Sequence, residues 1–309
     1  MDSPLVSVVI TNFNRCDDLR DALLSVKKQD YPHLEIIVVD NASEDESRAM
    51  LAREFPEVCS IPLEENIGMD GYSVGFRQAQ GELIFQMDND SVLPDAHVIS
   101  TIVKRFSEGP TDLAAVATRV EETRQTTYSV EALRDQDKRQ GPINAGGFHS
   151  GGVGFKKSLV DQVGDYNKDV FLYGSEVFLQ MKLLAKGYKI IFYPEILVLH
   201  KSSRVARSAT GVFYELRNRY WMARYLFSGV RRWSLIIQMM LHDVGYSLRK
   251  GTLRTLWHAW VKGLGTLPAS LDERLVSNEI DFKAKLQELY RTFNLPATLG
   301  RSYRTIKGG

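Results

Sequence analysis

The sequence predicts an α/β protein with a mainly parallel sheet, helices on both faces of that sheet, and a helical C-terminal extension. Three observations lead to this fold class. Short apolar runs rich in Val and Ile alternate with amphipathic segments up to about residue 118. These runs are almost uninterrupted, as in strands that are covered on both faces. From Thr210 onward the pattern is mostly helical, with Pro268 and Pro296 as helix breakers.

Strands and helices alternate in the first part of the chain. The strands are expected where short apolar runs occur, at Val6–Thr11, Ile36–Val39, Val58–Ile61, Leu83–Met87 and Leu113–Ala117. The helices are expected at 17–29, from about Met69 to Gln80, and at 95–106. Ser43 is expected to cap a further helix with acidic residues in its first turn.

The alternation breaks after about residue 118. Residues 119–145 are polar and aperiodic, which predicts a loop, and residues 146–154 are dense in glycine. Such a segment allows close approach of a ligand, or it forms a tight turn between strands. A helix is expected at about 175–187, followed by strands at 189–193 and 196–200.

This pattern divides the chain into two predicted domains. The first covers residues 1–208, with halves at about 1–118 and 119–208, and the helical extension covers 209–309. Of the 309 residues, 44% are hydrophobic and 25% are charged, as in a globular protein with a sizeable core. There is neither a signal-peptide pattern nor a run of 18 apolar residues, so we expect a cytoplasmic protein without a spanning helix.

The net charge of +1 conceals a marked asymmetry. Residues 201–309 carry a net charge of +12 and the first 200 residues carry −11. The basic part could contact phosphates or an anionic membrane surface, and residues 209–265 could lie on the inner face of a membrane. Alternatively, these helices pack on the first domain or on another subunit, in a homo-oligomer. We expect no nucleic acid as a partner.

Two carboxylates follow the fourth predicted strand, at Asp88 and Asp90. Ligands of open α/β sheets bind outside the carboxyl ends of strands. Hard oxygen ligands at this place suit Mg²⁺ or Mn²⁺ carrying a phosphate-bearing substrate. A solvated acidic turn would also explain the pattern.

Other polar side chains follow neighbouring strands. Asp40 could accept a hydrogen bond from a pyrimidine N3–H or a ribose hydroxyl, or it could cap the following helix. His200 could be a further metal ligand or a structural histidine. Arg204 and Arg207 come shortly after it, where they could neutralise a diphosphate.

Six motifs in order resemble family 2 of the GT-A glycosyltransferases. They are VSVVITNFNR (Val6–Arg15), IIVVDNAS (Ile36–Ser43), ENIG (Glu65–Gly68), QMDND (Gln86–Asp90), YGSE (Tyr173–Glu176) and AKGY (Ala185–Tyr188). The resemblance extends from about residue 5 to residue 200. It implies a GT-A fold and transfer of a sugar from a nucleotide diphosphate-sugar to an acceptor hydroxyl, with inversion at the anomeric carbon.

The resemblance also implies roles for individual residues. Asp90 and His200 would hold Mn²⁺ or Mg²⁺, and Glu176 would be the catalytic base. The nucleotide-binding residues would be Thr11, Asp40, Asn66, Asp88, Arg204 and Arg207, and the sugar pocket would include Gly151 and Gly152. The family's Glu-Asp pair reads Ser175-Glu176 here, so the carboxylate is longer by one methylene.

Two alternatives remain open at this point. The chain could be a catalytically silent GT-A domain that binds a nucleotide-sugar or a protein partner, or it could be a nucleotidyltransferase. For the transferase, a UDP- or dTDP-sugar is the favoured donor. The acceptor could be a glycan, a glycolipid or a small molecule, as in the biosynthesis of a polysaccharide, a glycolipid or a glycosylated metabolite.

Overall fold

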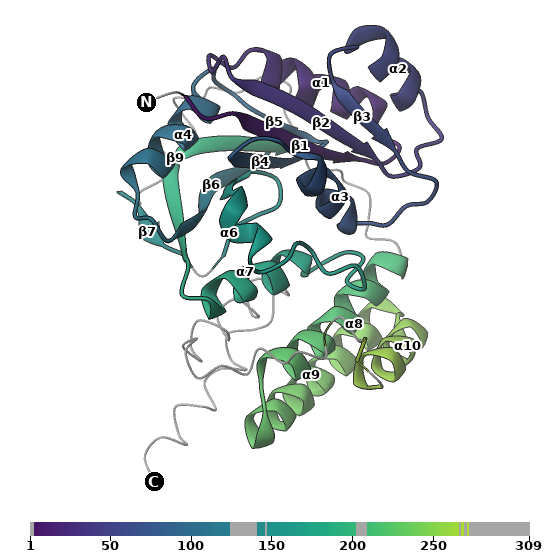
Figure 1. The fold of residues 1–309 in the computed structure, drawn as a ribbon. Helices are drawn as coiled ribbons and strands as arrows, with labels where there is room; N and C mark the ends of the chain where they lie inside the picture. Colours follow the sequence, from purple (N-terminus) through teal and green to yellow (C-terminus); the bar gives the residue numbers. More distant parts are fainter. Residues whose placement is uncertain are drawn as a thin grey trace. The chain divides into compact units, whose positions relative to one another are not determined.

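The computed structural model describes residues 3–123, 141–145, 147–201, 209–265, 267–268 and 271. The chain forms two compact units (Figure 1). The first takes in Met1–Tyr166 and Lys186–Arg204, and the second takes in Asn167–Ala185 and Val205–Gly309. Residues 167–185, which the sequence analysis assigned to the first domain, therefore group with the C-terminal helices.

The first unit is built around a nine-stranded sheet in the described residues, with the order β3-β2-β1-β4-β8-β6-β9-β5 and β7 paired to β9. The strands are β1 (Val6–Asn12), β2 (Leu34–Asp40), β3 (Cys59–Pro62), β4 (Leu83–Asp88), β5 (Ser91–Val92), β6 (Leu113–Thr123), β7 (Ile143–Asn144), β8 (Val153–Lys156) and β9 (Lys189–Lys201). The helices are α1 (Cys16–Lys27), α2 (Ser47–Glu54), α3 (Asp70–Gln78), α4 (Val98–Glu108) and α6 (Lys157–Asp161).

The predicted α/β class is confirmed, and the sheet is mixed. The pairings from β3 through β2 and β1 to β4 are parallel, as is that of β6 with β9. The short strands β5, β7 and β8 pair antiparallel with their neighbours. These strands were not predicted because they are short, and β8 also contains a glycine.

Helices cover both faces of the sheet (Figure 1). Val8 and Ile10 of β1 belong to one buried cluster with residues of α1, α2 and α4. Val9 points to the opposite face, because side chains alternate along a strand. There α3 lies so close that a Cβ on Gly75 would be 2.3 Å from Val9 Cγ1. Glycine at this position permits the contact.

Two local predictions were wrong for identifiable reasons. The segments predicted as two strands form the single strand β9, whose pairing with β6 shifts register between Thr118 and Arg119. The shift leaves Pro194 outside the pairing with β6, where its lack of a backbone N–H costs no hydrogen bond. Ser43 does not cap a helix, since α2 begins at Ser47. Its hydroxyl oxygen instead accepts the Asn14 N–H at 2.9 Å.

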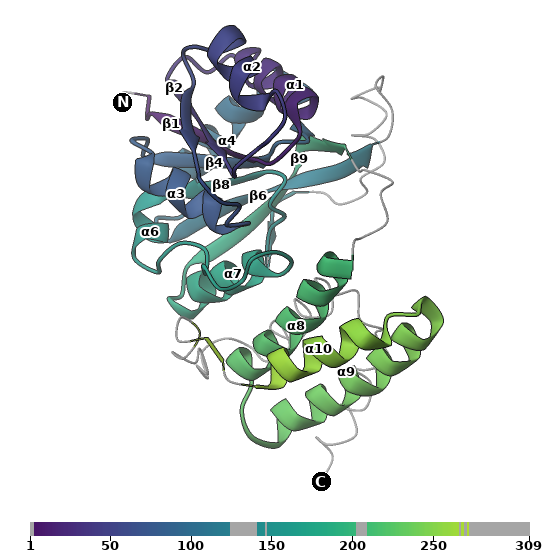
Figure 2. The same ribbon diagram turned by 90° about the vertical axis from the view of Figure 1, so that its right-hand side faces the viewer.

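The described part of the second unit is mostly helical, as was predicted from Thr210 onward. It contains α7 (Ser175–Ala185), α8 (Ala209–Leu226), α9 (Gly229–Lys250) and α10 (Leu253–Leu264). The last three pack against one another (Figure 2). Their shared core includes Met222 of α8 and Met239 of α9, both fully buried, and it also takes in Phe178 of α7. Among the described helices, none has both the length and the hydrophobicity needed to span a bilayer.

A buried polar network joins the three C-terminal helices. Arg219 of α8 is 4% exposed, and it forms an ion pair of 3.0 Å with the fully buried Asp243 of α9. The Tyr220 hydroxyl donates to the same carboxylate, and Trp260 Nε1 of α10 donates to the Tyr220 oxygen at 2.9 Å. Burial raises the pKa of Asp243, and the Arg219 charge opposes that rise.

We expect Asp243→Asn to lower the free energy of unfolding of the second unit by about 3–5 kcal/mol, because it leaves the Arg219 charge buried without a counter-charge. Urea denaturation followed by circular dichroism measures the change. The double variant Arg219→Gln with Asp243→Asn should recover part of the loss, since it removes both charges. Equal stability of Asp243→Asn and the unsubstituted protein would show that the ion pair contributes nothing.

Candidate metal and nucleotide site

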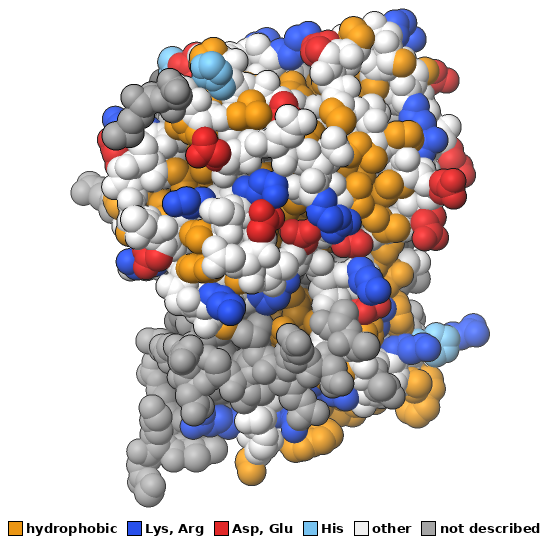
Figure 3. Space-filling view, in the orientation of Figure 1, with side chains coloured by type: hydrophobic (Ala, Val, Ile, Leu, Met, Phe, Trp, Pro, Cys, Tyr) orange, Lys and Arg blue, Asp and Glu red, His pale blue; other side chains and the backbone are white. Residues whose placement is uncertain are grey.

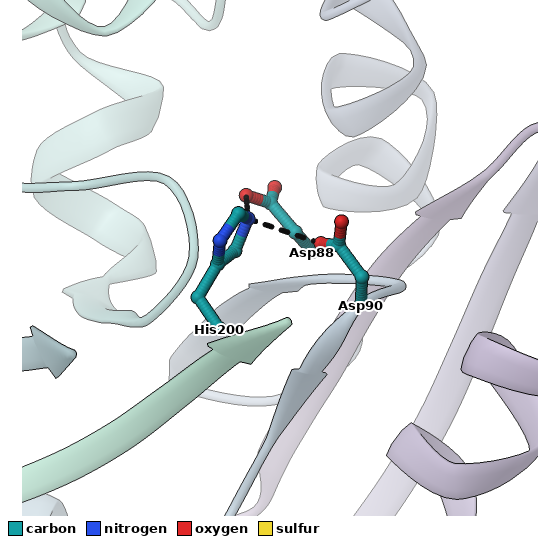
Figure 4. Close-up of side chains that lie close together, drawn as sticks. All are labelled: Asp88, Asp90 and His200. Atoms are coloured by element: carbon teal, nitrogen blue, oxygen red, sulfur yellow. Dashed lines mark ion pairs between the residues drawn. The ribbon is translucent and has the colours of Figure 1, made fainter. Parts of the chain in front are cut away.

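Strand pairing brings together Asp90 and His200, which were predicted as metal ligands, and Asp88, which was predicted to bind the ribose. Asp88 is the last residue of β4, and Asp90 precedes β5. In the pairing of β5 with β9, Ser91 lies opposite His200. The Lys201 N–H donates to the Asp90 carbonyl oxygen at 2.8 Å, which closes the same edge. Figure 4 shows the three side chains converging from β4, the following turn and β9.

The three side chains could hold a metal ion. One ligand atom from each lies within 4.8 Å of the others. His200 Nε2 is 3.1 Å from Asp90 Oδ1 and 3.8 Å from Asp88 Oδ2. An octahedral ion with ligands at about 2.1 Å places neighbouring ligand atoms about 3 Å apart. The donor set of two carboxylates and one imidazole therefore fits a small divalent cation such as Mg²⁺ or Mn²⁺.

Asp90 is the more deeply buried of the two carboxylates. It is 8% exposed, and its Oδ2 accepts from Arg15 Nη1 at 3.0 Å. Burial raises the pKa of Asp90, but the hydrogen bond from His200 and the positive charges of His200 and Arg15 outweigh this effect and lower it. The hydrogen bond to Asp90 in turn raises the pKa of His200. Asp90 is thus kept ionised, in the form that binds a cation.

Asp88 is oriented by two hydroxyl groups. The Tyr72 hydroxyl, from α3, lies 2.6 Å from Oδ1, and the Ser150 hydroxyl donates to Oδ2 at 3.1 Å. Burial raises the pKa of Tyr72 well above its ordinary value, which keeps the phenol protonated as a donor. Neither residue was predicted as part of the site. Each contact depends on tertiary structure and has no local signal in the sequence.

The end of β2 is tied to the Asp88-Asn89-Asp90 turn by side-chain hydrogen bonds. Asn12 Nδ2 donates to Asp40 Oδ1 at 3.2 Å, and Asn89 Nδ2 donates to Asn12 Oδ1 at 2.8 Å. The other Asp40 oxygen accepts from the Ser43 N–H at 3.1 Å and from Arg48 Nε at 2.6 Å. Asp40 is fully buried, so direct contact with a nucleobase requires these neighbours to move.

The remaining predicted nucleotide residues lie near the same edge or outside the described chain. Thr11 sits between β2 and β4, opposite Val39 and Asp88. Asn66 Oδ1 accepts the Gly68 N–H at 2.9 Å in a local turn. The predicted diphosphate contacts, Arg204 and Arg207, fall outside the described residues.

Of the two glycines predicted for the sugar pocket, one lies beside the proposed metal ligands. A Cβ on Gly151 would lie 3.0 Å from His149 Nδ1 and 3.2 Å from the Ser91 oxygen. The His149 ring packs edge-on against His200, with ring centroids 5.7 Å apart. Gly152 is packed elsewhere, because its Cβ would be 2.7 Å from Val198 Cγ2. Gly151 is therefore the one of the pair that borders the ligand cluster.

Glu176 lies in the second unit, in the first turn of α7. The preceding residues Tyr173 and Gly174 have φ angles of 54° and 88°, a left-handed pair that turns the chain into the helix. The fully buried Asn218 of α8 fixes this turn, because its Nδ2 donates to the carbonyl oxygens of Leu172 and Tyr173. The backbone that carries Glu176 is thus held by contacts within its own unit.

The fold is an α/β sheet with a candidate metal site at its carboxyl edge, and comparison with known proteins identifies the family. The family model for glycosyl transferase family 2 matches residues 7–164, just over half of the chain. The chain therefore belongs to glycosyl transferase family 2.

Relatives and solved structures place the chain more closely. It is 34% identical over 92 residues to the putative teichuronic acid biosynthesis glycosyltransferase TuaG of Bacillus subtilis, covering 28% of this chain and 36% of the relative. It is 32% identical over 111 residues to the GalNAc(5)-diNAcBac-PP-undecaprenol beta-1,3-glucosyltransferase of Campylobacter jejuni, covering 34% of this chain and 36% of the relative. The matched segments thus span about a third of the length of these relatives.

Solved structures that resemble almost the whole chain include a mannosyltransferase. It is the mannosyltransferase PcManGT from Pyrobaculum calidifontis in complex with GDP-Man and Mn²⁺, with a TM-score of 0.57 and 18% identity. The match covers 94% of this chain and 84% of that one. The predicted GT-A fold is confirmed by this similarity.

Proposed function

We propose that the protein is an inverting, metal-dependent glycosyltransferase. It transfers a sugar from a nucleotide diphosphate-sugar, with UDP- and dTDP-sugars favoured, to the hydroxyl of a glycan, glycolipid or small-molecule acceptor. The transfer would serve the biosynthesis of a polysaccharide, a glycolipid or a glycosylated metabolite. The observation that carries the proposal is the Asp88, Asp90 and His200 cluster at the carboxyl edge of the sheet, in a chain of this family.

In this proposal Asp90 and His200 hold the divalent ion. When bound, Mn²⁺ or Mg²⁺ acts as a Lewis acid that neutralises the diphosphate leaving group. The complex of PcManGT with GDP-Man and Mn²⁺ supports a divalent ion at this site.

The nucleotide would be held by residues at the same edge. Asp88 accepts hydrogen bonds from ribose hydroxyls, while Tyr72 and Ser150 fix its orientation. Thr11, Asp40 and Asn66 line the nucleobase side. Three of the roughly four acceptor sites of the Asp40 carboxylate are used by protein groups, which leaves one for a pyrimidine N3–H after local opening.

The reacting hydroxyl would be activated by Glu176. This carboxylate accepts the acceptor's proton as the oxygen attacks the anomeric carbon from the face opposite the diphosphate, which inverts the configuration. Arg204 and Arg207 pair with the departing diphosphate. Gly151, which lies beside His149 and Ser91, would border the donor sugar.

A donor panel tests the function. The protein is incubated with UDP-, dTDP- and GDP-sugars, with Mn²⁺ or Mg²⁺ and again with EDTA, and the released nucleoside diphosphate is measured. We expect metal-dependent release with one nucleotide class. Calorimetry of nucleotide binding in the presence of Mn²⁺ provides a second readout that does not require turnover.

The same panel separates the two alternatives. Nucleotide binding without release, across acceptors that include glycans and lipid-linked sugars, identifies a silent binding domain. Release of pyrophosphate from a nucleoside triphosphate and a sugar phosphate identifies a nucleotidyltransferase. Release that persists unchanged in EDTA contradicts the metal role of Asp90 and His200.

A further inference from the structure

Helix α9 presents a continuous apolar stripe to solvent. Its exposed apolar residues follow one another at intervals of three or four positions. They are Val230, Trp233, Ile237, Leu241, Val244 and Leu248, with exposures from 36% to 85%. At 100° per residue they fall within an arc of about 80°, and they extend over about 27 Å of helix. We call this set the α9 stripe.

The α9 stripe is not needed for the core of its own unit. The residues of α9 that pack inside are different ones, namely Leu235, Ile236 and Met239, each no more than 2% exposed. A helix that serves only as a cap would have polar residues on its outer face. Here the outer face is apolar as well, which makes it available to a second partner.

Helix α10 also presents apolar side chains to solvent. Leu253, Trp257 and Val261 recur every four residues and are 47%, 62% and 53% exposed. Leu256 and Ala259, on another side of the helix, are buried. Figure 3 shows hydrophobic side chains beside Lys and Arg side chains in the region that Figure 1 labels α9 and α10.

The charges around these stripes are of one sign. Residues 229–264 contain six Lys and Arg but a single acidic residue, Asp243. That carboxylate is fully buried and paired with Arg219. The exposed basic residues include Arg249, Lys250 and Arg254, close to the junction of α9 and α10. The surface therefore offers apolar side chains and positive charge together, without exposed carboxylates.

We propose that α9 and α10 form a surface that binds the headgroup region of an anionic lipid bilayer. Apolar side chains enter the boundary between headgroups and acyl chains, exposed Trp side chains favour that boundary, and Lys and Arg pair with anionic headgroups. A second copy of this chain fits less well. The basic side chains of this surface, among them Arg249, Lys250 and Arg254, would meet no exposed acid on the same surface of a second copy, because Asp243 is the single acidic residue of 229–264 and is buried.

This inference stands apart from the proposed activity, because every residue in it belongs to α9 or α10. Flotation of the full chain with liposomes tests it. We expect the protein to float with vesicles of phosphatidylglycerol and phosphatidylcholine, to float weakly with phosphatidylcholine alone, and to be released by high salt. The double variant Trp233→Ser with Leu241→Ser should reduce partitioning by at least about tenfold.

A second variant tests the charge separately. Lys250→Gln with Arg254→Gln should reduce partitioning by about fivefold for each charge removed. The matched control is Leu24→Ser, which removes an apolar side chain of 43% exposure from the first unit and should bind as the unsubstituted protein does. Circular dichroism melting verifies that each variant is folded, since all the changed side chains are exposed.

Three results would overturn the proposal. The first is that the folded protein does not bind anionic vesicles. Light scattering would then show what covers the stripe: either a dimer that the stripe variant dissociates, or a monomer in which another part of the chain covers it. The second is equal binding to neutral and anionic vesicles, which removes the role of charge. The third is unaltered binding by the stripe variant, which places the contact elsewhere on the chain.

Discussion

Replacing Asp90 by asparagine is expected to reduce sugar transfer by at least about a thousandfold while the protein remains folded. The amide keeps the size of the side chain but loses the negative charge that a divalent ion needs. Loss of metal-based charge stabilisation is worth several kcal/mol in the transition state, and about 4 kcal/mol corresponds to a thousandfold in rate. The rate of nucleoside diphosphate release under saturating donor and Mn²⁺ measures the effect.

Metal binding gives this prediction a readout that does not depend on activity. A ligand that binds only the folded protein stabilises it by about 2.7 kcal/mol at a concentration one hundred times its Kd. Mn²⁺ should therefore raise the melting temperature of the unsubstituted protein and leave that of Asp90→Asn unchanged. Asp161→Asn is the matched control, because Asp161 is an exposed carboxylate paired with Lys157 on α6. Full activity in Asp90→Asn would exclude the proposed metal site.

Replacing Glu176 by glutamine is expected to reduce turnover by about 10²–10⁴-fold without weakening donor binding. Glutamine has the same shape but cannot accept a proton at neutral pH, and this range is typical for the loss of general base catalysis. Parallel measurements of turnover and of nucleotide affinity by calorimetry separate the two effects. The turn before Glu176 is fixed by Asn218 and not by Glu176 itself, so the fold should be maintained.

Glu176→Asp is the matched control for this second prediction. It keeps the carboxylate and has the aspartate that the resemblance implies for the family's Glu-Asp pair, so it should retain measurable activity. Its residual rate shows how much the position of the carboxylate matters, since a displacement of about 1 Å can reduce the rate about a hundredfold. If Glu176→Gln turns over as fast as the unsubstituted protein, the base is another group.

The sequence was sufficient to predict the elements whose signal is local. The apolar β-branched runs of β1, β2 and β4 marked buried strands, and they were found within two residues of their predicted ends. The brief strand β5 was missed because two residues, Ser91 and Val92, carry no periodicity. The grouping of 167–185 with the C-terminal helices was also missed, since it depends on packing between distant segments.

The same distinction applies to the site. Asp88, Asp90 and His200 could be predicted to converge because each follows or ends a strand, and strand ends meet at the edge of a sheet. The roles of Tyr72 and Ser150 could not be predicted, because each side chain comes from a separate element and reaches Asp88 only in the folded chain. Asp40 was predicted as a site residue, but its burial and its hydrogen bonds with Asn12 and Arg48 were not predicted.

The pairing of Ser91 with His200 has a consequence for synthesis of the chain. Proteins emerge from the ribosome N-terminus first, and domains fold as their segments become available. Asp88 and Asp90 emerge early, but the strand that carries His200 follows residues 167–185, which belong to the other unit. A growing chain therefore lacks His200 at this cluster until β9 has left the ribosome and paired with β5. The proposed ion site of Asp90 and His200 is complete only from that point.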